Sequence, residues 1–144
     1  MKDKRVQMVA ELAAPHLRQG EQIEMTVYAN VGSVSIKRVA ATAAVVAVAT
    51  AGMFTAFARP RKTYPALTSQ RLMFFDGETM SGRPGKLLFT LPRQAVSVAA
   101  VDKGALTLKA ELAIKGQDKG LRLVFPTVAR KGGEQAVAAL RAAA

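Results

Sequence analysis

The residues that could perform chemistry are few in this sequence. It contains no cysteine, so it forms neither a disulfide nor a thiolate nucleophile, and it lacks the ligands of Cys-based zinc and iron–sulfur sites. His16 is the single histidine, which argues against a histidine-based metal site and a Ser-His-Asp triad. Asp76 and Glu78 are a close carboxylate pair, but they lie in a predicted turn. We therefore expect no enzymatic activity, no metal and no cofactor, and a role in binding or at a membrane.

Basic charge is unevenly distributed along the 144 residues, whose formal net charge is +11. Residues 31–62 contain five bases and no acid, placed on both sides of an uncharged stretch at 39–58. A predicted loop at 79–85 contains one further base, and another follows it directly. Each Lys or Arg near an acidic membrane contributes about 1 kcal/mol of attraction. The alternative is a solvated basic surface that only keeps the protein soluble. The side chains that we expect to bind lipid headgroups are Lys37, Arg38, Arg59, Arg61, Lys62, Arg83 and Lys86.

The uncharged stretch at residues 39–58 is long enough to cross a bilayer as a helix. Its 20 residues would span about 30 Å, which is the thickness of the hydrocarbon core. Nine of these residues are alanine and none is leucine or isoleucine, so a single isolated span would be marginal. Small residues would instead suit close helix–helix packing. The side chains expected to contact the membrane are Val45, Val46, Val48, Met53, Phe54 and Phe57.

Three arrangements of this stretch are open: a transmembrane helix, a helix lying on the membrane or against a partner, and a buried helix or strand pair in a soluble fold. Its two flanks carry two and three bases, so the bias of positive charge does not give an orientation.

The remaining sequence predicts a mainly β domain with a helix at each end. Apolar residues at helical spacing indicate a helix over residues 3–18, and an alanine-rich helix is expected over residues 134–143 after a Gly132-Gly133 breaker. Pro65 indicates an edge strand or an irregularity. Alternation and turn residues predict seven strands, at residues 22–31, 63–68, 71–76, 86–91, 95–101, 105–114 and 121–125.

Three short segments resemble motifs of the bacterial PH-like and GRAM-like domains. They are LRQGE at residues 17–21, YPALTSQRLMFF at residues 64–75, and Leu91-Pro92 before residues 96–101. The resemblance covers residues 17–144, and many bacterial members carry hydrophobic segments. It implies an α+β, mainly β fold: a PH-like seven-stranded antiparallel barrel or sandwich, capped by a C-terminal helix. In this chain we expect an N-terminal amphipathic helix at residues 1–20, and a PH-like domain at residues 21–144 that is interrupted after its first strand by a hydrophobic helix.

The position of the hydrophobic stretch creates a conflict within this prediction. A single membrane crossing at residues 39–58 would place strand 22–31 and strands 63–125 on opposite sides, where they could not share a sheet. Either the first strand lies outside the barrel, or the helix does not cross and instead lies in the interface, re-enters or packs on another copy. Arg71, in the LTSQR motif, is expected to face solvent or to pair with Asp76 or Glu78.

The expected function is that of a non-enzymatic, membrane-associated PH-like module that binds acidic phospholipid, with a protein partner or a second copy in a homo-oligomer as the alternative. We expect it at the cell membrane with the domain facing the cytoplasm, the alternative being a cytoplasmic protein that acts through protein–protein contacts. A nucleic-acid-binding protein, suggested by the pI near 10.6, ranks behind because no RNA or DNA motif occurs. A soluble barrel with a ligand pocket would require a large apolar cavity.

Overall fold

The structure, a computed structural model, describes residues 4–35, 56–115, 117 and 119–142. These residues form eight antiparallel strands and two α-helices, joined by short 3-10 helices and loops. The elements are α1 (Lys4–Ala13), η1 (Ala14–His16), β1 (Ile23–Thr26), β2 (Ala29–Ser35), β3 (Arg61–Thr68), β4 (Arg71–Asp76), β5 (Leu87–Pro92), η3 (Arg93–Ala95), β6 (Val96–Lys103), β7 (Leu108–Ile114), β8 (Lys119–Phe125), η4 (Thr127–Ala129) and α3 (Arg130–Ala142).

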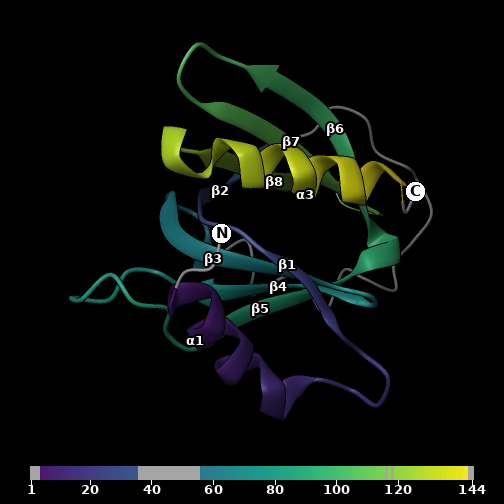
Figure 1. Cartoon of the computed structure of the whole chain (residues 1–144). Coiled ribbons are helices and arrows are strands. Elements are labelled where there is room, and N and C mark those ends of the chain that lie inside the picture. The colour runs from purple at the N-terminus through teal and green to yellow at the C-terminus, as the bar shows by residue number, and fades with distance from the viewer. Residues whose placement is uncertain (1–3, 36–55, 116, 118, 143–144) are drawn as a thin grey trace.

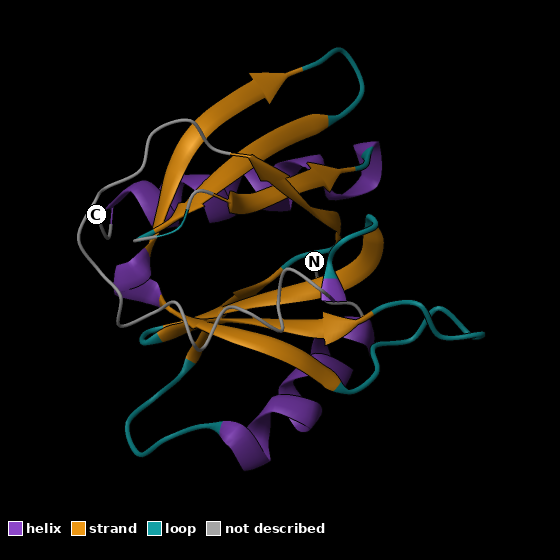
Figure 2. Ribbon diagram, turned by 180° about the vertical axis from the view of Figure 1, so that it is seen from behind, coloured by secondary structure: helices purple, strands orange, loops and turns teal. Residues whose placement is uncertain are grey.

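The strands form one unclosed sheet in the order β5-β4-β3-β2-β8-β7-β6, with β1 paired to β3 beside β2. Figure 1 shows the sheet folded into two halves, with β3, β4 and β5 in one and β6, β7 and β8 in the other. The view from behind shows the same two halves (Figure 2). Helix α3 crosses the second half, while α1 lies on the outer side of the first half. β2 joins the halves because it pairs with β3 on one side and with β8 on the other.

The strand predicted at residues 22–31 is divided into two strands, and Pro65 lies opposite the break. β1 pairs with β3 up to Thr26, and β2 resumes the pairing from Ala29. Proline has no N–H to donate to a neighbouring strand. The Pro65 carbonyl accepts a hydrogen bond from the N–H of Val27 in the gap, at 2.9 Å. Of the two alternatives predicted from Pro65, the edge strand is wrong, because β3 lies between β4 and β2, whereas an irregularity is present opposite Pro65. The strand predicted to end at residue 31 continues to Ser35.

The apolar side chains form two clusters on opposite faces of the sheet. The larger one fills the space between the two halves and α3, and it includes Phe74, Phe125 and Leu140. The smaller one lies under α1, where Val9 and Ala13 pack with side chains of β3 and β4. Burying a large apolar side chain stabilises the folded state by about 1.5–3 kcal/mol relative to leaving it exposed. The apolar face predicted for the N-terminal helix is therefore the surface that attaches it to the sheet.

Helix α3 begins earlier than predicted and includes the two glycines that were expected to break it. Gly133 lies so close to the sheet that a Cβ built on it would be 2.5 Å from the ring of Phe125. Gly132 similarly lies next to Val27 of the β1–β2 connection. Glycine costs about 1 kcal/mol of helix propensity relative to alanine, but here it lets the backbone approach the core closely. The pair is therefore a packing device within the helix.

The connection between β2 and β3 returns to the sheet next to where it leaves. The N–H of Ser33 donates to the carbonyl of Phe57 at 2.9 Å, and Phe57 is fully buried against Phe74 with ring centroids 5.6 Å apart. β2 is a central strand, so the possibility that the first strand lies outside the sheet is wrong. Residues 39–55 of the hydrophobic stretch lie outside the described residues. Within the part of the chain that the structure describes, no helix is both long and apolar enough to span a bilayer.

Candidate functional site

The start of β3 and the β4–β5 connection come together at one end of the first half of the sheet. The backbone N–H of Gly77 donates to the carbonyl of Lys62, and the Tyr64 hydroxyl donates to the carbonyl of Gly82 at 2.7 Å. At the base of the loop, the N–H of Asp76 donates to the carbonyl of Lys86. Four of the bases that we predicted to bind headgroups, from two separate segments, are thereby brought to this end: Arg61, Lys62, Arg83 and Lys86.

The acidic pair in this loop serves the loop itself. A carboxylate oxygen of Asp76 accepts from the backbone N–H of Glu78 at 2.9 Å and from the Arg61 guanidinium at 3.0 Å. The Glu78 carboxylate in turn accepts from the backbone N–H of Lys62. These bonds support the turn expected at these residues, and they engage one of the four bases with an acid.

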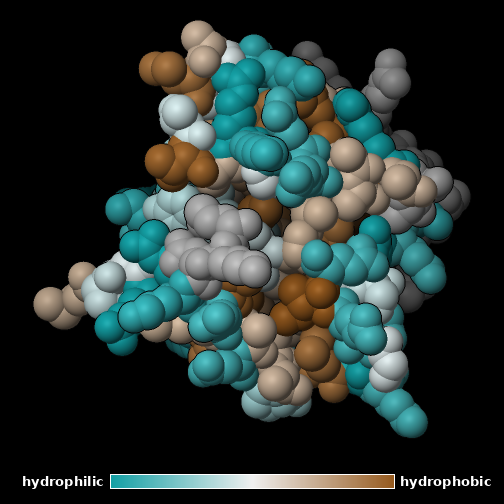
Figure 3. Space-filling model, viewed as in Figure 1, coloured by the Kyte–Doolittle hydropathy of each residue, from teal (hydrophilic) through white to brown (hydrophobic). Residues whose placement is uncertain are grey.

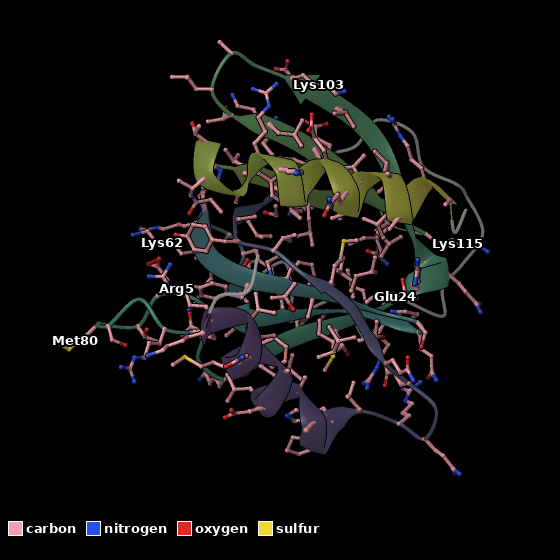
Figure 4. The ribbon with its side chains drawn as sticks, viewed as in Figure 1. Arg5, Glu24, Lys62, Met80, Lys103 and Lys115 are labelled. Atoms are coloured by element: carbon pink, nitrogen blue, oxygen red, sulfur yellow. The ribbon has the colours of Figure 1, made fainter. Side chains whose placement is uncertain are left out.

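Met80 is the most exposed large apolar residue of the described chain, and it lies in this loop. Figure 4 shows Met80 projecting from the molecule on the side that also carries Lys62 and Arg5. In the space-filling view the loop protrudes with apolar atoms at its tip and hydrophilic residues behind them (Figure 3). Lys62, Arg83 and Lys86 are exposed, and no described carboxylate lies within ion-pair distance of their side chains.

We refer to Lys62, Met80, Arg83 and Lys86 as the basic loop end. An apolar tip surrounded by cations can insert the tip among acyl chains while the cations contact anionic headgroups. Sequence analysis identified the three cations and missed Met80. The available signal was a single large apolar residue in a loop rich in Gly, Ser and Pro.

The other predicted site residues have different positions. Arg59 is exposed just before β3, near the bases of that strand. Phe57, which we expected to contact a membrane, is completely buried and is a core side chain. The remaining predicted residues lie outside the described part of the chain: Lys37, Arg38, Val45, Val46, Val48, Met53 and Phe54.

Arg71 is paired with Glu21, which corrects the expected partners Asp76 and Glu78. Its guanidinium donates to both carboxylate oxygens of Glu21, at 2.7 and 3.0 Å, and to the backbone carbonyl of His16 at 2.6 Å. The Glu21 side chain is fully buried and also accepts from the hydroxyl of Thr68. The Arg71 guanidinium beside it is the main cause that lowers the pKa of Glu21 from 4.5 to about 2, although burial opposes this shift.

The sequence around Glu21 explains how its carboxylate reaches Arg71. Gly20 has a φ of 78°, a left-handed conformation that favours glycine, and it forms a turn in which the N–H of Glu21 donates to the carbonyl of Arg18. The N–H of Arg18 in turn donates to the Glu21 carboxylate at 2.9 Å. The pair therefore fixes the N-terminal helix to the β3–β4 hairpin, and its burial gives it a structural role.

The interior has no room for a small-molecule ligand in the part that the structure describes. The void between α3 and the two sheet halves has a volume of about 20 Å³ and is lined by apolar side chains such as Met25, Leu72 and Phe125. Pockets for small molecules usually exceed about 300 Å³. Among the described residues no three His, Asp or Glu side chains are placed to hold a metal ion together.

Neither the family models nor the curated proteins provide a relative of this chain. No family model matches the chain, and a search of the curated proteins finds none with significant similarity to it.

Proposed function

We propose that this chain is a non-enzymatic PH-like module that binds the acidic surface of the cell membrane from its cytoplasmic side, through the basic loop end. The observation that carries the proposal is the fully exposed Met80, in a loop whose cations have no described acidic partner.

The architecture supports the PH-like part of the proposal. When β1 and β2 are counted as one bent strand, the chain has seven antiparallel strands followed by a C-terminal helix, the layout that the sequence resemblance implies. The two segments LRQGE and LTSQR, which carry that resemblance, are joined in space by Glu21 and Arg71.

Charge and exposure support the membrane part. Three cations that each contribute about 1 kcal/mol near an acidic bilayer provide together roughly a hundredfold preference for acidic over neutral lipid. Burial of Met80 would add an apolar contribution that does not depend on salt. The binding is therefore expected to weaken with salt without disappearing.

The test is co-sedimentation of the full chain with vesicles of phosphatidylcholine alone, or of phosphatidylcholine mixed with phosphatidylglycerol. The triple variant Lys62→Gln, Arg83→Gln, Lys86→Gln is expected to lose most of the preference for acidic vesicles. Met80→Ser is expected to lose the part of the vesicle binding that resists salt. The matched control, Lys109→Gln, Lys115→Gln, Lys119→Gln, removes three exposed lysines from β7, β8 and their connection. Equal losses in the two triple variants would show a general charge effect and refute the site. Unchanged binding in the first triple variant would also refute it.

A further inference from the structure

Met80 differs from the other methionines that the structure describes in its exposure to solvent. Its side chain is fully exposed in the β4–β5 connection, whereas Met73 is completely buried. Met8 and Met25 are half-buried, and Met25 packs against the larger apolar cluster. Oxidation of a thioether requires the oxidant to reach its sulfur. Met80 is therefore the described methionine that a dissolved oxidant reaches most easily.

No thiol in this chain competes with Met80 for an oxidant. The sequence contains no cysteine, the side chain that peroxides otherwise attack first. For the same reason the chain has no thiol of its own with which to reduce an oxidised methionine. Both the oxidant and the reductant must therefore come from outside the chain, and the exposed position of Met80 is open to both.

Hydrogen bonds within the loop hold Met80 in its exposed position (Figure 4). The N–H of Gly82 donates to the carbonyl of Thr79 at 3.0 Å, which closes a turn that contains Met80. Gly82 has a φ of 72°, and its carbonyl accepts from the Tyr64 hydroxyl at 2.7 Å. The hydroxyl of Thr79 donates to the carbonyl of Arg83, also at 2.7 Å. The exposure of the sulfur therefore follows from the bonded shape of the loop.

Oxidation by a peroxide converts this apolar side chain into a polar one. The thioether sulfur takes one oxygen atom from the peroxide, so an S–O bond forms and the O–O bond breaks. The sulfur loses two electrons, and hydrogen peroxide, which gains them, leaves as water with both of its protons. The sulfoxide that results is unfavourable among acyl chains, where its oxygen has no hydrogen-bond donor. The nearby cations Lys62, Arg83 and Lys86 keep their charge.

We propose that Met80 is a site of reversible oxidation by peroxides, and that this oxidation regulates how strongly the basic loop end binds an acidic membrane. The inference rests on the proposed function. The thioether form inserts its side chain and resists salt, whereas the sulfoxide form retains only the salt-sensitive attraction of the cations. A reductase that supplies two thiols reverses the step: the thiols become a disulfide, the sulfoxide oxygen leaves as water, and the thioether is restored.

The first experiment measures where hydrogen peroxide oxidises the full chain, and how fast. Trypsin leaves Met73 and Met80 in one peptide, whose fragment ions locate the added oxygen by mass spectrometry. We expect Met80 to be oxidised at least roughly tenfold faster than the buried Met73. Vesicles that contain phosphatidylglycerol are expected to protect Met80, and vesicles of phosphatidylcholine alone are not. Equal rates at Met73 and Met80, or no protection by acidic vesicles that bind the chain, would overturn the inference.

The second experiment compares vesicle binding at high salt before and after peroxide treatment. Oxidation is expected to weaken binding of the unsubstituted chain to acidic vesicles roughly tenfold, and methionine sulfoxide reductases with dithiothreitol are expected to restore it. Met80→Leu has no sulfur at this position, so treatment is expected to leave its own binding unchanged. Met8→Leu is the matched control and should remain sensitive. A sensitive Met80→Leu variant or an insensitive Met8→Leu variant would overturn the inference.

The outcomes separate this inference from the proposed function. An unchanged thermal midpoint after treatment shows that the loss of binding does not come from oxidation of the core. If the untreated chain binds acidic vesicles and Met80→Ser loses the salt-resistant part, but oxidation of Met80 changes nothing, the inference is wrong and the proposed function stands. If the untreated chain does not bind acidic vesicles, both are wrong.

Discussion

Glu21 and Arg71, fifty residues apart in the sequence, form a bidentate ion pair whose carboxylate is completely removed from solvent. The pair joins the turn after the N-terminal helix to the first residue of β4, and the Thr68 hydroxyl and the Arg18 N–H complete the carboxylate's hydrogen bonds. A buried charge is stable only when its partners are all present, so this pair makes the docking of the N-terminal segment specific.

Removal of one partner is expected to destabilise the protein strongly. Arg71→Met leaves the Glu21 carboxylate buried without its cation, and we expect a loss of about 3–5 kcal/mol in the free energy of unfolding. Urea unfolding measures this value. In the double variant with Glu21→Leu the loss is expected to be much smaller than the sum of the two single losses. An additive result would contradict the coupling between the two side chains.

The same pair predicts how stability depends on pH. The pKa of Glu21 falls from 4.5 to about 2 on folding, so the folded state favours the ionised carboxylate. Its contribution to stability is therefore fully present above pH 4.5 and is lost as the pH falls toward about 2. The stability difference between the native protein and Glu21→Gln is expected to shrink over this interval. A constant difference in urea midpoint between the two proteins would contradict the prediction.

Gly133 is expected to resist replacement despite its unfavourable helix propensity. A methyl group at this position would overlap the Phe125 ring, so Gly133→Ala should destabilise the protein by about 1–3 kcal/mol. The exposed control Gln135→Ala, on the same helix, should change stability by less than about 0.5 kcal/mol. Thermal unfolding checks both. If Gly133→Ala were stabilising, helix propensity would outweigh the close packing.

Phe57 and Met80 are expected to respond in opposite ways, although both are large and apolar. Phe57→Ala should cost about 3–5 kcal/mol of stability, because it leaves a cavity beside Phe74, and it should not directly weaken binding to acidic vesicles. Met80→Ala should leave stability nearly unchanged and weaken vesicle binding. The measurements are urea unfolding and vesicle co-sedimentation. A stable Phe57→Ala protein with weakened vesicle binding would place Phe57 at the membrane and contradict the core assignment.

The sequence alone determined the local elements where each one follows from a short-range pattern. The alternation in residues 105–114 and 121–125 predicted strands that the structure contains as β7 and β8, and helical spacing predicted α1 and its apolar face. Pro65 identified an irregular position because the missing N–H is a property of the residue itself. The three cations of the basic loop end were identifiable because the charge of a lysine or arginine side chain follows directly from the residue type.

The tertiary structure decided the features that depend on residues far apart in the chain. The partner of Arg71 could not be inferred from spacing, because Asp76 and Glu78 were nearer in sequence than Glu21, which the fold brings into reach. Gly132 and Gly133 were expected to precede the C-terminal helix as a breaker, because helix propensity is a local property. Only the proximity of Phe125 and Val27 explains their place inside the helix. Phe57 belonged to an apolar stretch with no sequence signal for its burial. Its carbonyl and ring contact Ser33 and Phe74 in the folded protein, where the pairing of β2 with β3 brings these distant residues into one interior.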